Sequence, residues 1–326
     1  MKHYEPIEKL AYGPLDKKVN LLPDFFTDFV PQRRAQIVAE EAKFYKGITA
    51  PYSVSGRLDT AWARFSAGDG YEVPVKTYRP KDAEGTLPAL VFFHGGGFKT
   101  CSVETHDFVP AYLAANAGVM AFSVDYRLAP EDKFPTGLED CYQAIVWIVR
   151  HANALKVDPR RIIVCGDSSG GNFAAAITQL ARKRRDVAIE KQVLIYPALE
   201  FTGTIKKRSA EVYAMVGAKE HAATGASKIM PLMWDYLEDP EREVYNPLVS
   251  PVLAESFANL PEALFIQAEC DALADDGLIY AKLLADAGVP VTCKVYKGMP
   301  HAFILRTYEE TFEALDEICR FLSAKE

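Results

Sequence analysis

The chain has 326 residues, of which 49% are hydrophobic and 25% are charged, the balance of a soluble globular protein. It holds 37 Lys and Arg residues against 44 Asp and Glu residues, and the net charge of −7 argues against a nucleic-acid-binding surface. No apolar run has the length of a signal peptide or of a membrane helix, and the cysteines and histidines form no Cys-x-x-Cys or His-x-x-x-His pair. We therefore expect a cytoplasmic protein that binds neither a metal ion nor a membrane.

Short apolar runs of strand length alternate along the chain with longer helical patterns. Residues 58–65 and 73–78 flank the turn Gly68-Asp69-Gly70, which predicts an antiparallel hairpin at the start of the sheet. Six more strands are predicted over residues 89–93, 119–124, 162–165, 192–196, 263–267 and 291–296. Several of these runs are almost continuously apolar, as in strands buried on both faces. The pattern predicts a mostly parallel sheet of eight strands.

Amphipathic helices are predicted between the strands and at the end of the chain. They cover residues 135–153, residues 275–287 and a terminal segment with Leu305, Tyr308, Phe312, Leu315, Ile318 and Leu322 at spacings of three and four. We expect such helices on both faces of the sheet. Residues 291–296 would form its last strand, and this edge could pair with its copy in a two-fold homodimer.

Two segments do not follow this alternation. Residues up to about 52 have a helical pattern before the first strand, and residues 200–246 interrupt the sheet between two strands. We interpret both as one helical cap over the strand ends, where doubly wound sheets bind ligands. The chain has no linker of Pro, Gly and Ser, so residues 1–326 are predicted to form a single domain.

The cap segment also supplies candidate substrate contacts. A medium-sized pocket could be lined by Phe98, Tyr213, Met215, Met233 and Trp234. The same side chains would serve equally well to pack the cap against the sheet, and the sequence leaves both interpretations open.

The run Gly166-Asp167-Ser168-Ser169-Gly170-Gly171 directly follows the apolar run 161–165 and opens a helical pattern. A Gly-x-Ser-x-Gly run between a strand and a helix is typical of a nucleophile elbow. The glycines remove side chains that would collide in the tight turn, and the helix amides favour developing negative charge at Ser168. Ser168 is therefore the candidate nucleophile.

A glycine-rich loop, His94-Gly95-Gly96-Gly97-Phe98, follows the predicted strand 89–93. Bare backbone amides at a strand end can bind the oxyanion of a tetrahedral intermediate. We assign these donors to Gly96 and Gly97, together with Ser169 from the elbow. We expect His94, at the entry to the loop, to brace it by hydrogen bonds.

The candidate base is His301, in a loop between the predicted strand 291–296 and the terminal helix. The orienting acid should precede this histidine in the chain, and Asp271 has the best position. Nearby rivals are Glu269, which we expect to bond to loop backbone, and Asp275 and Asp276, which we expect to be solvated residues at a helix start.

Together these motifs, with Asp125-Tyr126-Arg127-Leu128-Ala129-Pro130-Glu131, resemble the hormone-sensitive-lipase-like family of α/β-hydrolase carboxylesterases. The resemblance covers about residues 55 to 326. It implies the α/β-hydrolase fold, with Ser168 as nucleophile, His301 as base, Asp271 as acid and the glycine loop as oxyanion hole. Two positions depart from the family pattern. Ser169 stands where alanine is usual. Ala272 stands where the family usually has a proline, which would make the loop stiffer.

These residues predict a serine carboxylesterase that hydrolyses short- to medium-chain acyl esters through an acyl-enzyme, without a cofactor. An amidase or lactonase of the same fold would use the same attack chemistry and stays open. A non-catalytic ligand-binding protein of this fold is the remaining alternative. The presence of serine, acid and histidine together favours an enzyme.

Overall fold

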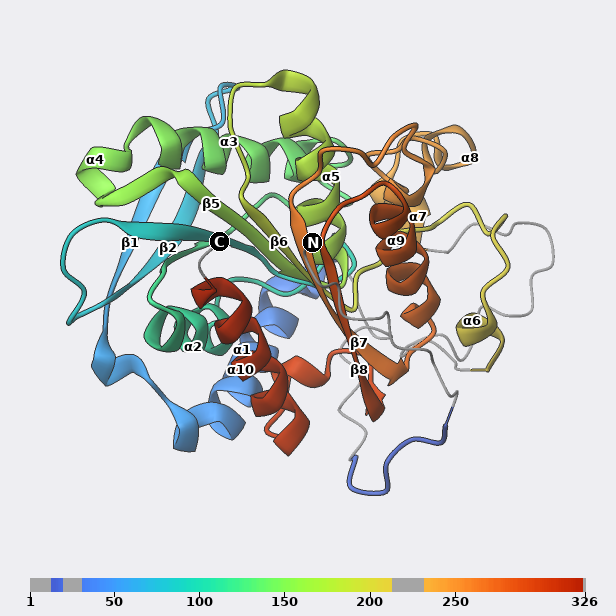
Figure 1. The fold of residues 1–326 in the computed structure, drawn as a ribbon, viewed down its shortest axis with the longest axis horizontal. Coiled ribbons are helices and arrows are strands. Elements are labelled where there is room, and N and C mark those ends of the chain that lie inside the picture. The colour runs from blue at the N-terminus through green and yellow to red at the C-terminus, as the bar shows by residue number, and fades with distance from the viewer. Residues whose placement is uncertain (1–12, 20–30, 213–231, 325–326) are drawn as a thin grey trace.

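The computed structural model describes residues 13–19, 31–212 and 232–324. Eight strands form one sheet in the order β1-β2-β4-β3-β5-β6-β7-β8 (Figure 1). β1 and β4 both pair with β2 in the antiparallel sense, and all later neighbours are parallel. The predicted eight-stranded, mostly parallel sheet is therefore confirmed, including its N-terminal hairpin.

All predicted strands are present, and most of them run beyond the predicted bounds. The strands are β1 (Leu58–Ser66), β2 (Glu72–Pro80), β3 (Leu87–Phe93), β4 (Met120–Val124), β5 (Val157–Asp167), β6 (Lys191–Ile195), β7 (Glu262–Cys270) and β8 (Val291–Pro300). β5, β7 and β8 each continue to a residue next to a candidate site residue. These strand ends are set by backbone hydrogen bonding to a neighbouring strand, which the hydrophobic pattern of the sequence does not predict.

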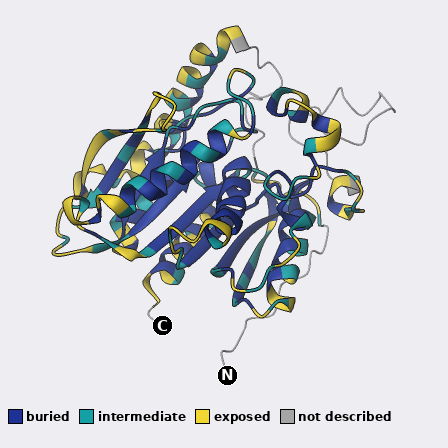
Figure 2. Ribbon diagram, turned by 90° about the horizontal axis from the view of Figure 1, so that it is seen from above, coloured by how far each residue is buried: buried dark blue, intermediate teal, exposed yellow. Residues whose placement is uncertain are grey.

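The sheet is buried on both faces through its centre. Every residue of β4 and β6 is buried, whereas most residues of β1, at the end of the sheet, are exposed. Figure 2 shows the central strands and the helix faces turned toward them as buried. Side chains pack into one apolar cluster on each face of the sheet, which is the expected form of a doubly wound α/β domain.

Helices cover both faces, as predicted (Figure 1). One face carries α1 (Arg34–Thr49), α2 (Phe108–Ala117) and α10 (Glu309–Ser323), and the other carries α3 (Thr136–Arg150), α5 (Ser169–Arg184) and α9 (Ala274–Asp286). The predicted helix 135–153 is divided at His151, after which α4 (Ala152–Leu155) begins. The predicted terminal helix begins only at Glu309, because residues 303–305 form a separate 3-10 turn.

The two segments assigned to the cap are described in part. They contain α1, α6 (Arg208–Val212), α7 (Leu232–Tyr236) and α8 (Pro240–Glu243), whereas residues 1–12, 20–30 and 213–231 lie outside the described residues. Residues 13–19 form a turn, so the prediction that everything before residue 52 is helical is wrong there. Gly13 and Pro14 explain this, because both residue types disfavour a helix interior.

Contacts place both cap segments against loops that follow strands. Arg34 of α1 donates from Nε to the Lys99 carbonyl over 3.0 Å, and Asp235 of α7 binds Lys99 Nζ at 2.9 Å. Lys99 follows β3, so both contacts lie at the carboxyl edge of the sheet. The grouping of the two segments into one cap stays a prediction.

β8 lies at the end of the sheet, where we predicted an edge strand. Its residues Cys293, Lys294, Val295 and Tyr296 each have further interactions. The position of β8 is thus confirmed, and its pairing with a second copy stays a prediction.

Candidate active site

Ser168 sits in a strained turn between β5 and α5. Its backbone has φ 55° and ψ −118°, a conformation that is costly for a residue with a side chain. A Cβ on Gly170 would lie 2.0 Å from the Phe93 carbonyl oxygen, and one on Gly166 would lie 2.3 Å from the Gly170 carbonyl oxygen. Only glycine lets β3, β5 and α5 approach so closely, and this approach holds Ser168 in its turn.

Three side chains from separate parts of the chain form a hydrogen-bonded row. His301 Nε2 lies 2.9 Å from Ser168 Oγ, and His301 Nδ1 lies 2.6 Å from Asp271 Oδ2. Ser168 follows β5, Asp271 follows β7 and His301 follows β8, so all three lie at the carboxyl edge of the sheet. The structure brings together the three residues assigned to nucleophile, acid and base.

The surroundings of His301 favour its protonated form. Burial opposes the positive charge, but the charge of Asp271 and its hydrogen bond outweigh this and raise the pKa of His301. The His301 side chain keeps 20% of its surface exposed, whereas Asp271 is 2% exposed. The carboxylate is thus shielded from water and held against an imidazole that is partly open to solvent.

The rival acids bind other groups. Glu269 accepts hydrogen bonds from the amides of Gly298, at 3.0 Å, and Gly13, at 3.4 Å, which are the predicted contacts with loop backbone. Asp275 accepts a bond from the Ser209 amide. Asp276 was predicted to be solvated, and this is wrong: it is fully buried and lies 2.9 Å from Lys207 Nζ.

The glycine loop leaves backbone amides bare beside the elbow. Gly96 and Gly97 both have positive φ, 122° and 59°, and the Gly96 carbonyl accepts the amides of Lys99 and Thr100. Among the described residues, no acceptor is bound to the amides of Gly96 and Gly97, nor to that of Ser169 at the start of α5. Free donors of this kind are what an oxyanion hole requires.

Asp167 supports this loop, a role that sequence analysis missed. Its Oδ1 accepts the Gly95 amide over 2.8 Å, and its carboxylate lies 3.3 Å from His106 Nε2. Burial alone would raise the pKa of Asp167, but the charge of His106 and these hydrogen bonds hold it below its usual value. The sequence does hold a signal for this role. Asp167 stands next to Ser168 at the end of a buried strand, and a buried carboxylate needs hydrogen-bonding or charged partners.

His94 makes bracing contacts of the kind predicted for it. The Tyr126 hydroxyl donates to the His94 carbonyl over 2.7 Å, and the two rings stack at 4.4 Å. His94 Nδ1 lies 2.7 Å from the Gly95 carbonyl. Complete burial lowers the pKa of His94 to about 3, so the ring is neutral and fixes the entry of the loop.

The candidate pocket residues fall in three environments. Phe98 is buried and stacks on Tyr236 of α7 at 4.0 Å, and Met233 is buried in the same apolar cluster. Trp234 has half of its surface exposed. Tyr213 and Met215 lie outside the described residues. The contacts of Phe98 and Met233 match the packing alternative, and a pocket formed by these residues stays a prediction.

The described residues contain neither a candidate metal cluster nor a membrane-spanning helix. No group of three or more His, Cys, Asp or Glu side chains there could hold a metal ion. None of the helices in these ranges combines the length and the apolar character needed to cross a membrane.

Known proteins resemble the chain in sequence and in structure. A family model described as alpha/beta hydrolase fold matches residues 90–305. An ethyl acetate hydrolase of Pseudomonas putida is 37% identical over 241 residues, covering 72% of this chain and 73% of its own. An arylesterase of Saccharolobus solfataricus is 36% identical over 242 residues, covering 72% and 74%. An esterase of Pyrobaculum calidifontis superposes with a TM-score of 0.80 at 35% identity, over 91% of this chain and 94% of its own.

The close approach at Gly170 predicts an unusual response to alanine. On helix propensity alone, Gly170→Ala in α5 should stabilise the fold by about 1 kcal/mol. The added Cβ would instead lie 2.0 Å from the Phe93 carbonyl oxygen, so we expect a loss of about 2 kcal/mol or more in the free energy of unfolding. Urea denaturation measures it, with Gly56→Ala as control because nothing lies within 4 Å of its Cβ. Equal stabilities for both variants would disprove the packing argument.

Proposed function

The chain belongs to the hormone-sensitive-lipase-like family of α/β-hydrolase carboxylesterases, and we propose that it hydrolyses short- to medium-chain acyl esters with Ser168 as nucleophile. The observation that carries the proposal is the row of 2.9 Å and 2.6 Å contacts that joins Ser168, His301 and Asp271. A serine is a weak nucleophile unless a base takes its proton, and this row supplies the base and the group that orients it.

In the proposed reaction, Ser168 Oγ attacks the ester carbonyl while His301 Nε2 takes its proton. The amides of Gly96, Gly97 and Ser169 bind the oxyanion that forms, and each donor contributes roughly 3 kcal/mol in comparable enzymes. His301 then protonates the leaving alcohol, which leaves an acyl group on Ser168. Water repeats the attack, with His301 again as base, and releases the acid. No step uses a cofactor.

Asp271 orients the imidazole throughout the proposed reaction. It binds Nδ1 and so leaves Nε2 free to accept the serine proton. When His301 becomes charged, the adjacent carboxylate stabilises it. The pKa of His301 is already raised in the free protein, which supports this role.

The substrate is proposed to be a small ester. Relatives named ethyl acetate hydrolase and arylesterase support this class. We propose that the acyl group lies beside Ser168, in a pocket to which Phe98, Met233 and Trp234 contribute, whereas the candidates Tyr213 and Met215 lie outside the described residues. We also propose that the protein works in the cytoplasm, since all six of its cysteines are free thiols. Cell fractionation of the source organism tests the location.

We further propose a homodimer formed through β8, which ends the sheet. Two-fold pairing of such an edge would extend the sheet across two copies. Light scattering at micromolar concentration should then give twice the chain mass of 36.2 kDa. A monomeric mass over the whole concentration range would contradict the proposal.

Replacing the nucleophile should abolish hydrolysis. For Ser168→Ala we expect kcat on p-nitrophenyl acetate and butyrate to fall by about 10⁴-fold or more, because the remaining groups cannot form the acyl-enzyme. A series from acetate to long acyl chains then gives the acyl preference. Amide and lactone substrates serve as competitors. Equal turnover by wild type and variant would refute the assignment of Ser168.

The activity should have an acidic limit set by His301. The base must be neutral, and its pKa is raised above the ordinary histidine value by Asp271. Activity should therefore fall tenfold per pH unit below a midpoint higher than about 6.5. In Asp271→Asn the midpoint should move to lower pH, and kcat should fall by about 10⁴-fold. A kcat/KM profile that is flat down to about pH 4 would exclude histidine as the base.

A further inference from the structure

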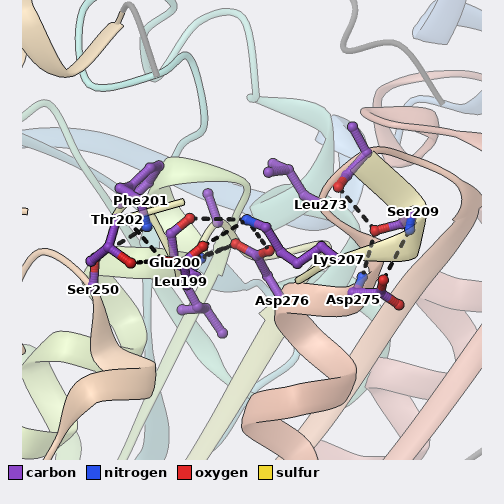
Figure 3. A network of polar contacts seen from close by, with 12 residues as sticks. Leu199, Glu200, Phe201, Thr202, Lys207, Ser209, Ser250, Leu273, Asp275 and Asp276 are labelled. Atoms are coloured by element: carbon purple, nitrogen blue, oxygen red, sulfur yellow. Dashed lines mark hydrogen bonds and ion pairs between the residues drawn. The ribbon is translucent and has the colours of Figure 1, made fainter. Parts of the chain in front are cut away.

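The chain that follows β6 is attached to the loop that carries Asp271. The acid loop, as we call it, consists of residues 271–273, which join β7 to α9, together with residues 274–276, which form the first turn of α9. Ser209, in α6, and Lys207, just before it, both bind the loop from outside (Figure 3). α6 belongs to the segment 200–246 that interrupts the sheet, so two distant parts of the chain meet next to the acid of the triad.

Ser209 makes three hydrogen bonds to the loop. Its hydroxyl donates to the Ala272 carbonyl over 3.0 Å and accepts from the Asp275 amide over 3.2 Å. Its own amide donates to Asp275 Oδ2 over 2.9 Å. Ser209 is fully buried, so water does not compete for these bonds. The side chain thus fixes the loop on both sides of its first turn.

Lys207 adds an ionic attachment one residue further along the loop. Its Nζ lies 2.9 Å from Asp276 Oδ1 and 3.2 Å from Glu200 Oε2. Both carboxylates are fully buried, and the lysine side chain is 10% exposed. Two buried carboxylates near one cation need that cation, because the cost of leaving them unpaired is large. Lys207 therefore holds the start of α9 against the segment that follows β6.

Asp271 depends on this loop for its orientation. Its Oδ1 accepts the Leu273 amide over 2.9 Å, while Oδ2 faces His301. Its carbonyl accepts the Ala274 amide over 3.1 Å. Each of these bonds lies within the turn or joins Asp271 to His301. Position 272 is alanine, which does not fix the backbone angle φ as the usual proline would. Supports outside the turn, such as Ser209 and Lys207, would limit its movement further.

We infer that Ser209 and Lys207 are positioning residues for Asp271, so that the segment after β6 helps to align the triad as well as covering the strand ends. The inference rests on the proposed function, in which Asp271 orients His301. A shift of about 1 Å in a group that aligns reacting atoms can lower a rate by 10²-fold. The residues that hold the catalytic side chains in place therefore matter to the rate as the residues that contact substrate do.

The test compares two buried serines of the same network. Ser209→Ala removes the hydroxyl bonded to Ala272 and Asp275. Ser250→Ala is the control, because Ser250 is also fully buried but its hydroxyl accepts the Phe201 amide over 3.1 Å, away from the acid loop. Neither change alters a charge, so both proteins should fold and lose thermal stability to a similar extent.

For Ser209→Ala we expect kcat on p-nitrophenyl butyrate to fall about tenfold, with KM within about twofold of the wild-type value. The acidic limit of kcat should move to lower pH, because a less firmly held Asp271 stabilises the imidazolium less. The low-field proton resonance of His301 Nδ1 should broaden or shift in this variant. Ser250→Ala should leave kcat, the acidic limit and the resonance unchanged.

Equal effects in both variants would overturn the inference, since they would reflect general loosening of the network. Wild-type behaviour of Ser209→Ala would overturn it as well. If the wild type hydrolyses no ester, the proposed function fails, and the His301 resonance alone then decides whether Ser209 positions Asp271. A change confined to Ser209→Ala supports the inference.

Discussion

The close approach of Gly170 to the Phe93 carbonyl holds the glycine loop after β3 beside Ser168 after β5. A side chain at position 170 would meet the end of β3, so α5 can begin where it does only with glycine as its second residue. This approach brings the glycine loop after β3 beside Ser168 after β5, because β3 and β5 are neighbours in the sheet. The strained backbone of Ser168 is held by the same packing. Without it, nucleophile and oxyanion donors would separate.

The strand order places the remaining groups. β6, β7 and β8 follow β5 in sequence and in space, and each ends at the same edge. Asp271 and His301 therefore follow adjacent strands, and His301 extends back toward Ser168. Buried charges then fix the loops: Asp167 holds Gly95 behind the oxyanion donors, and Lys207 holds Asp276 behind the acid. Both of these buried carboxylates have partners, as burial of a charge requires.

The sequence was sufficient for the sheet and for the row of three residues, because both leave local signals. Apolar runs mark the strands, and glycines next to Ser168 mark a turn that no other residue permits. The supports of the acid loop left no such signal. Asp276 sits at a helix start, where solvated acids are common, and its partner Lys207 is 69 positions away in the chain. Pairings across that separation depend on tertiary packing, which periodicity does not encode.

The central claim is that Ser168 carries the acyl group during ester hydrolysis. A p-nitrophenyl alkylphosphonate offers the most direct test, because it reacts with the nucleophile and stops at a stable adduct that mimics the tetrahedral intermediate. Mass spectrometry should find one adduct per chain, on the peptide that contains Ser168, and its formation should parallel the loss of esterase activity. An adduct on another residue, or full inactivation with Ser168 unmodified, would contradict the account.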